Sequence, residues 1–135
     1  MKLPLDTRVA MWWMVDDPQL PNRIADLIDT EPAVHISAVS PWEITIKQFL
    51  GEFEGPGELA EQVRDLPFVG VPVTAAHGVR AGRLPILHTD PFDRILVAQA
   101  QAEGMALVTR SPWIRQYDVQ VMPVRPARGP APHLR

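Results

Sequence analysis

The segment from Leu87 to Gln101, LHTDPFDRILVAQAQ, places two carboxylates at the start of a helix that is apolar on almost every side. Asp90 has the chemistry of a helix N-cap, and Pro91 suits the first helical position, where no N–H is needed. A helix that is apolar all round is normally buried, so the rest of the chain has to surround it. Asp93 lies in its first turn, on the stripe expected to face the core. A carboxylate aimed inward is costly unless a donor, a cation or a metal neutralises it.

Around this helix the sequence predicts strands and helices in alternation. The expected strands are Leu3–Leu5, Val34–Val39, Phe68–Val73, Ala106–Thr109 and Val119–Met122. The expected helices are Arg8–Met14, Pro21–Asp29, Pro41–Leu50, Glu58–Leu66, Ala75–Gly82 and Pro91–Glu103. This alternation predicts an α/β fold with a central, mainly parallel sheet of about four to five strands flanked by helices.

Two local features refine this expectation. Ser40, Pro41 and Glu43 form a capping-box pattern, with Ser40 as the cap of the helix that follows. The apolar residues of that helix are expected to face the core: Trp42, Ile46, Phe49 and Leu50. Pro4 has no N–H for a ladder hydrogen bond, so it suits an edge strand or the first residue of a strand and is costly in a central one.

The 135 residues are enough for one domain with a sizeable core, which we place at residues 1–123. Residues 124–135 are rich in proline and arginine and are expected to be a flexible tail. The absence of cysteine excludes disulfide and thiolate chemistry and favours the reducing cytoplasm. The longest apolar run, Val9–Val15, is too short to span a bilayer, so no membrane association is expected.

Three acids are expected at one edge of the sheet. Asp6 follows the first strand, Glu43 opens the helix after the second, and Asp93 opens the helix before the fourth, which Thr109 ends. The carboxyl ends of parallel strands share one edge, where ligands of such sheets bind. Clustered carboxylates repel one another without a counter-ion, and their oxygens suit Mg²⁺ or Mn²⁺. Such a metal can activate water and offset charge on a phosphodiester.

Each acid also has a purely structural interpretation, which the pattern alone leaves open. Glu43 fits a capping box or an ion pair with Lys47 four residues on. Asp93 fits the dipole at a helix N-terminus, and Asp6 fits an N-cap. A phospho-aspartyl receiver fold also has an acid after its first strand, but it needs a lysine late in the sheet. The only lysines are Lys2 and Lys47, so this alternative is set aside.

An ordered set of short motifs extends from Leu5 to about Met122. The motifs are Leu5-Asp6-Thr7, Ser37-Ala38-Val39-Ser40, Trp42-Glu43-Ile44, Ile46-Lys47-Gln48, Gly82-Arg83-Leu84-Pro85, Asp90-Pro91-Phe92-Asp93-Arg94, Val97-Ala98-Gln99-Ala100 and Leu107-Val108-Thr109-Arg110. In kind and order they resemble the PIN-domain family, and within it the VapC-type toxin ribonucleases of bacterial toxin–antitoxin pairs.

The resemblance implies a PIN-like fold, Mg²⁺ or Mn²⁺, and endonucleolytic hydrolysis of RNA such as tRNA or rRNA. It also implies a homodimer, neutralisation by a VapB-type antitoxin, and contact with operator DNA only through the antitoxin complex. The family's catalytic and metal-binding acids match Asp6, Glu43 and Asp93. Supporting polar positions match Thr7 and Thr109. RNA phosphate contacts are expected from two basic residues, Arg94 and Arg110.

The chain departs from the family pattern at a position that matters for metal binding. The family usually has a fourth acid directly after the Thr-Arg pair, and this chain has Ser111. A hydroxyl cannot replace the charge of a carboxylate, so we expect one well-held metal and weaker metal affinity. Asp90 would partly compensate if its side chain turns inward. The alternative function is therefore a weakened or inactive PIN scaffold that binds RNA or an antitoxin without cutting.

Overall fold

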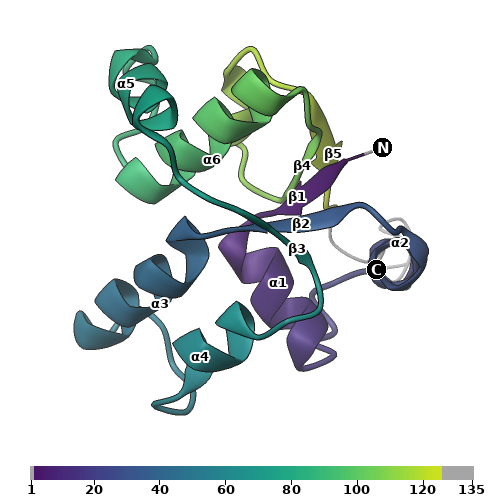
Figure 1. Ribbon diagram of the computed structural model, residues 1–135. Helices are drawn as coiled ribbons and strands as arrows, with labels where there is room; N and C mark the ends of the chain where they lie inside the picture. The colour runs from purple at the N-terminus through teal and green to yellow at the C-terminus, as the bar shows by residue number, and fades with distance from the viewer. Residues whose placement is uncertain (1, 126–135) are drawn as a thin grey trace, which may run out of the picture.

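A computed structural model describes residues 2–125, and the structural statements below refer to these residues (Figure 1). The strands are β1 (Leu3–Leu5), β2 (Val34–Ser37), β3 (Val69–Val71), β4 (Leu107–Thr109) and β5 (Val121–Pro123). The helices are α1 (Thr7–Met14), α2 (Asn22–Thr30), α3 (Val39–Phe49), α4 (Leu59–Arg64), α5 (Ala75–Arg83) and α6 (Pro91–Glu103), with one 3₁₀ turn, η1 (Ile114–Gln116). Every expected strand and helix is present, with some changes at their ends.

The five strands form one sheet in the order β3-β2-β1-β4-β5, and every neighbouring pair is parallel. This confirms the predicted α/β class. The chain first builds β1, β2 and β3 toward one edge and then continues on the other side of β1 with β4 and β5. The winding direction therefore changes between β1 and β4. In parallel α/β sheets, a ligand crevice forms at the carboxyl ends of the strands at this kind of switch point.

Helices cover both faces of the sheet. Figure 1 shows α5 and α6 on one side of the strands and α1 and α4 on the other. The core on the α6 side contains Leu96 and Val97 with Leu107 of β4, and the opposite core contains Val9 of α1 and Ile24 of α2. Burying side chains of this size contributes about 1.5–3 kcal/mol each. The two cores hold the carboxyl ends of β1 and β4 in place from both sides.

The central helix α6 matches its sequence prediction closely. The Asp90 carboxylate accepts hydrogen bonds from the backbone N–H groups of Phe92 (2.9 Å) and Asp93 (3.4 Å), and Pro91 occupies the first turn. Five consecutive residues, 96–100, are at most 2% exposed. The helix ends at Gly104, whose left-handed φ of +64° suits a residue without a Cβ. Its first turn thus presents two carboxylates at a defined position.

The start of α3 differs from the predicted capping box. The helix begins at Val39, so β2 ends at Ser37, whose hydroxyl accepts from the Val39 N–H at 3.1 Å. Ser40 therefore lies inside the helix and caps nothing. Its hydroxyl bonds Thr7 instead, and Glu43 accepts from Thr7 and from Lys47. The capping-box prediction was wrong because both side chains are used in tertiary contacts.

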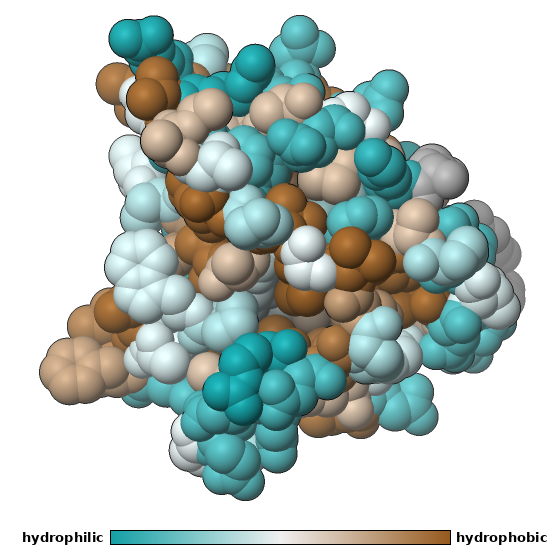
Figure 2. All heavy atoms as spheres, in the orientation of Figure 1, coloured by the Kyte–Doolittle hydropathy of each residue, from teal (hydrophilic) through white to brown (hydrophobic). Residues whose placement is uncertain are grey.

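The face of α3 that packs against the protein is also not the predicted one. Its large apolar side chains are exposed by 59%, 37%, 88% and 61%, in the order Trp42, Ile46, Phe49 and Leu50. Figure 2 shows apolar atoms standing out over the free end of this helix, at the lower left. Buried instead are Ser40, Glu43 and Ile44, at most 3% exposed. The inward-facing prediction was wrong because the polar stripe is the one that packs.

Pro4 lies in β1, which is the central strand and not an edge. On the β2 side the strand keeps three residue pairs in register, from Leu3↔Val34 to Leu5↔Ile36. On the β4 side only Leu5↔Val108 is paired. Pro4 has no N–H to donate, so the short pairing with β4 is what a proline in this strand allows.

The predicted tail begins with a residue that is packed. Val124 is 2% exposed, and its N–H donates to the Thr109 carbonyl at 2.9 Å. Most of the tail, residues 126–135, lies outside the described residues. Among residues 2–125, no helix combines the length and the apolar character needed to cross a membrane.

Candidate active site

A cavity of about 390 Å³ opens where β1 and β4 end, and its wall contains four carboxylates. They come from three parts of the fold: Asp6 follows β1, Glu43 lies in α3, and Asp90 and Asp93 stand at the start of α6. The three acids predicted from the sequence are thus brought together, and Asp90 joins them.

Asp6 bridges the two strands at the switch point. Its Oδ2 accepts a hydrogen bond from the buried Thr109 hydroxyl at 2.6 Å, and its Oδ1 accepts from the Arg8 N–H at 3.2 Å. Thr109 Oγ1 in turn accepts from the Ser111 N–H at 3.0 Å. The carboxylate therefore caps α1, as one prediction held, and is also fixed at the end of β4. These bonds orient Asp6 at the cavity wall.

Glu43 belongs to a buried hydrogen-bond chain on α3. Thr7 donates to Glu43 Oε1 at 2.5 Å, so the Ser40 hydroxyl, 2.8 Å from Thr7 Oγ1, is left to donate to Thr7. Lys47 Nζ lies 2.6 Å from Glu43 Oε2 and 3.0 Å from Asp90 Oδ2, so one ammonium bridges α3 and α6. Both Glu43 oxygens are thereby satisfied. Thr7, predicted as a supporting polar residue, therefore lies in direct contact with one of the predicted acids.

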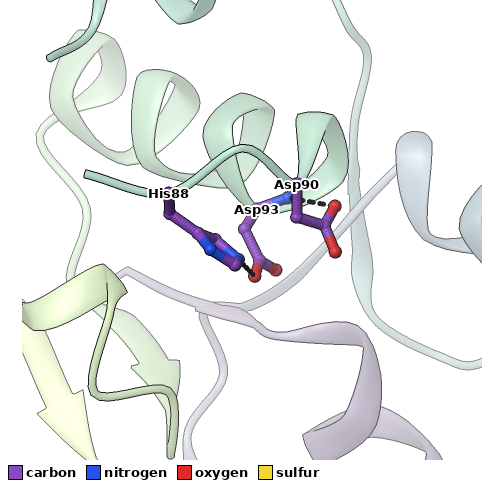
Figure 3. A group of neighbouring side chains, drawn as sticks. All are labelled: His88, Asp90 and Asp93. Atoms are coloured by element: carbon purple, nitrogen blue, oxygen red, sulfur yellow. Dashed lines mark hydrogen bonds and ion pairs between the residues drawn. The ribbon is translucent and has the colours of Figure 1, made fainter. Parts of the chain in front are cut away.

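Asp93 lies beside a histidine that precedes its helix. His88 Nε2 is 2.9 Å from Asp93 Oδ2, and Figure 3 shows the ring and the carboxylate pointing toward each other while Asp90 turns aside to cap the helix. One donor atom from each of His88, Asp90 and Asp93 lies within 4.8 Å of the others. No hydrogen bond found within residues 2–125 uses Asp93 Oδ1. That oxygen is available to a ligand in the cavity.

The cluster carries more negative charge than its surroundings neutralise. Burial raises the pKa of Asp93 to about 8, and the nearby charges of Asp6, Asp90 and Glu43 contribute to this rise. Burial also raises the pKa of Asp6 and of Glu43, although hydrogen bonds from Thr109 and Lys47 work against the change. Lys47 is the one lysine or arginine within residues 2–125 whose side chain pairs with these carboxylates, and it contacts Glu43 and Asp90 but not Asp6 or Asp93. Such a site favours uptake of a proton or a metal cation.

The donor set fits a divalent cation. Carboxylate oxygens at a partly buried edge are the hard ligands that Mg²⁺ and Mn²⁺ take, and a neutral imidazole suits later transition metals and Mn²⁺ better than Mg²⁺. The unused Asp93 Oδ1 and the raised pKa of Asp93 both indicate an unmet demand for positive charge. The residues that could hold the cation are Asp6, Glu43, Asp90 and Asp93, with His88 beside them.

The remaining predicted residues, Ser111, Arg110 and Arg94, differ in their positions relative to the cavity. Ser111 lines the cavity, and its hydroxyl accepts from the Ile114 N–H at 3.4 Å at the start of η1. Arg110 lines the cavity too, but its Nε donates to the Val124 carbonyl and its Nη2 to that of Gln19, while the guanidinium lies 4.5 Å over the Trp12 ring. Arg110 therefore lines the same cavity as the acids, while two nitrogens of its guanidinium already donate hydrogen bonds to backbone carbonyls.

Arg94 is not brought to the cavity. Its two terminal nitrogens donate to backbone carbonyls along the segment before α6, at 2.8–3.4 Å: Ala81, Gly82, Leu84, Pro85 and His88. It also bonds the Tyr117 hydroxyl at 3.3 Å. The sequence prediction of a phosphate contact does not match this position, because these bonds use both ends of the guanidinium fork. Arg94 instead anchors the loop that carries His88.

Several cavity residues were not assigned a site role from the sequence, among them Lys47, His88 and Trp113. Lys47 was considered only as a local partner of Glu43, and its bond to Asp90 spans 43 residues. His88 precedes the Asp90 cap by two residues, which is a usable signal, but a loop histidine gives no direction for its ring. Trp113 follows Ser111 closely, and nothing in the sequence places it against His88.

The comparisons agree with the fold and identify the family. The sequence matches the PIN domain over residues 4–119, so the chain belongs to the PIN-domain family. No curated protein matches it. The fold is also shared with solved chains of low sequence identity. Their similarity in structure extends over most of this chain.

Three solved structures illustrate the likeness. DNA-bound VapBC from Salmonella typhimurium has a TM-score of 0.68 and 13% identity, covering 93% of this chain and 99% of that chain. VapBC2 from Rickettsia felis, bound to a promoter DNA fragment, has a TM-score of 0.64 and 16% identity, covering 90% and 96%. FitAcB from Neisseria gonorrhoeae has a TM-score of 0.63 and 18% identity, covering 89% and 96%.

Proposed function

We propose that this protein is a VapC-type toxin, a metal-dependent endoribonuclease that hydrolyses phosphodiester bonds in RNA such as tRNA or rRNA. The observation that carries the proposal is the cluster of Asp6, Glu43, Asp90 and Asp93 around one cavity at the switch point of a PIN sheet. Within residues 2–125 neither Asp6 nor Asp93 forms an ion pair with a lysine or arginine, so an added cation would supply positive charge here, and a phosphodiester reaction requires the same charge.

In this proposal Mg²⁺ or Mn²⁺ would be held by Asp93 and Asp6, with Asp90 and Glu43 beside them. When bound, the cation offsets charge on the phosphate and lowers the pKa of water. The chain's own groups keep the carboxylates in place: Thr109 fixes Asp6, and Lys47 ties Glu43 to Asp90. The Arg8 and Arg110 side chains at the cavity wall add positive charge for an RNA backbone.

The partners proposed for this activity follow the solved complexes in kind. Those structures contain VapBC or FitAB assemblies, and several hold DNA. We infer a cognate VapB-type antitoxin for this chain, a toxin homodimer, and operator DNA bound through the antitoxin complex. The cytoplasm is the proposed location, as for a protein that acts on cellular RNA.

Ser111 supports a second candidate function. It leaves the cavity without the fourth carboxylate of the family, and the Lys47 ammonium already lies between Glu43 and Asp90. A protein that holds one cation in place of two would bind RNA or antitoxin and cut slowly or not at all.

The two functions are separated by incubating bulk tRNA with the purified, antitoxin-free protein in Mg²⁺, in Mn²⁺ and in EDTA. The nuclease predicts discrete fragments that need the metal and that disappear in Asp93→Asn, which removes one charge from the cavity. Asp26→Asn, on the exposed side of α2, is the matched control and should cut normally. Folded protein that cuts no RNA under any metal would reject the nuclease and favour the binding scaffold.

A further inference from the structure

Two aromatic rings are stacked in the wall of the acidic cavity. The indole of Trp113, just before η1, lies parallel to the imidazole of His88, with an interplanar angle of 4° and 5.8 Å between ring centroids. Both residues line the cavity with the carboxylates. Trp113 is nevertheless 49% exposed. Because His88 covers one face of the indole, the exposed area lies mainly on its other face and its edge.

This stack is held from behind by the fold. The His88 N–H donates to the Tyr117 hydroxyl at 3.0 Å, and the His88 carbonyl accepts from Arg94 at 3.2 Å. Tyr117 is buried, at 6% exposure. The ring of His88 is further tied to Asp93 by the 2.9 Å contact of Nε2. A flat surface that is already ordered loses little conformational entropy when a ligand stacks on it.

We propose that the open face of Trp113 binds an unpaired nucleobase of the substrate, next to the phosphodiester bound in the acidic cavity. This inference rests on the proposed ribonuclease function and adds a base-binding residue to it. Every nucleobase has a π-face that stacks on an aromatic side chain, with little dependence on sequence. The base would lie one ring away from His88, which itself contacts Asp93. The nucleotide at this position must be unpaired for its base to stack on the indole.

The surroundings of Trp113 favour a nucleotide over a protein partner. The cavity that Trp113 lines contains three basic side chains, Arg8, Lys47 and Arg110, together with the four carboxylates. Positive groups beside an aromatic surface form the combination that single-stranded nucleic acids recognise. The exposed apolar residues of α3 lie outside this cavity. An apolar face of that kind suits a protein partner better.

The test measures binding of a short single-stranded RNA in which each nucleotide in turn is replaced by an abasic one. All proteins carry Asp6→Asn, which slows cleavage during the measurement. For otherwise unchanged protein, one abasic position should weaken binding about tenfold, the size expected for one stacked base. With Trp113→Ala the same abasic replacement should cost nothing, since the stacking partner is absent. Trp113→Phe should restore part of the sensitivity.

Two controls keep the result specific. Trp42→Ala removes an exposed tryptophan outside the cavity and should keep the full abasic effect. Trp113→Leu fills the same space without a comparable π-surface and serves if the alanine variant is unstable. The fully paired form of the RNA should bind Trp113 and Trp113→Ala proteins equally.

An abasic effect that persists unchanged in both Trp113→Ala and Trp113→Leu would overturn the stacking site. So would a Trp113→Ala protein that binds every RNA normally but loses its hold on the cognate antitoxin, because the face would then belong to a protein partner. Cleavage of tRNA by the unsubstituted protein is measured in parallel. If cleavage occurs and Trp113 has no effect, only this inference fails. If RNA is neither cut nor bound, the ribonuclease proposal fails with it.

Discussion

Helices α6 and α3 both contribute acids to the cavity, but they are built in opposite ways. In α6 the acids are confined to the first turn, and the rest of the helix buries apolar residues such as Leu96. In α3 the polar residues Ser40, Glu43 and Lys47 follow one face for two turns and point inward, and although Ile44 is buried, large apolar residues such as Phe49 are left outside. The first turn of α6 and a polar face along α3 therefore supply the acidic site.

This difference shows which kind of energy holds each helix. The position of α6 depends on burial of apolar area, which is insensitive to pH and cations. The position of α3 depends on burial of Ile44 and Val39 and also on hydrogen bonds and one ammonium among carboxylates, whose free energy changes with both. The predictions below separate the two cases.

The largest effect is expected from Leu96→Ala in α6. Leu96 is 2% exposed, so truncation leaves a cavity and should lower the free energy of unfolding by about 3 kcal/mol. Phe49→Ala in α3 is the matched variant, since its ring is 88% exposed, and it should change stability by no more than about 0.5 kcal/mol. Urea denaturation measures both. Equal losses in the two variants would contradict the burial assigned to α3.

Lys47→Met should cost roughly 2 kcal/mol at pH 8, because Glu43 and Asp90 lose the ammonium between them. Burial already raises the pKa of Glu43, and losing Lys47 should raise it further. When the folded-state pKa of a carboxyl is raised, the free energy of unfolding of the protein falls as the pH rises. The loss of stability caused by Lys47→Met should therefore be smaller at pH 5. Lys2→Met, at the only other lysine, is the control for net charge. Thermal unfolding at the two pH values measures the loss of stability. An equal loss at pH 5 and pH 8 would contradict the prediction.

Asp93→Asn should stabilise the cation-free protein by about 1–2 kcal/mol at pH 9. The pKa of Asp93 is about 8 in the folded protein, above its value in the unfolded chain. The folded state therefore keeps a proton on Asp93 at pH values where the unfolded chain has lost it. The wild type loses stability as the pH rises toward and through 8. The variant cannot titrate at this position and should lose less. Saturating Mn²⁺ should reverse the order, since it stabilises the wild type by mass action. Unfolding curves with and without Mn²⁺ measure both effects.

The smallest effect is expected from Ser111→Asp, which restores a carboxylate where the family usually has one. Mn²⁺ affinity should rise about tenfold, equivalent to about 1.4 kcal/mol, when measured by calorimetric titration. Ser111→Ala should leave the affinity close to that of the wild type. No gain with the added acid would show that Lys47, and not the lost carboxylate, limits how many cations the cavity accepts.

The sequence predicted the sheet and the acids because these depend on local patterns. Apolar strands alternating with helices determine a parallel sheet, and acids placed just after strands or at helix starts must meet at its carboxyl edge. The orientation of α3 could not be predicted in the same way. Its hydrophobic pattern pointed to Trp42 and Phe49 as core residues, whereas Glu43 is held inside by Thr7 and Lys47.

The contacts missed from the sequence are those between distant segments. The family resemblance suggested Arg94 as a phosphate contact, but it donates to carbonyls 6 to 13 residues earlier. His88 and Trp113 stack across 25 positions of chain, which neither residue's local pattern encodes. Side-chain direction in loops is decided by such partners, so it emerges only with the three-dimensional structure.

The way Arg94 fastens the segment before α6 has an evolutionary consequence. Its guanidinium binds main-chain oxygens from Ala81 to His88, and every amino acid supplies that oxygen. Exposed side chains in this segment, such as that of Ile86, can therefore change while the path of the main chain is kept. A single arginine would then maintain the shape of a loop whose exposed surface is free to vary.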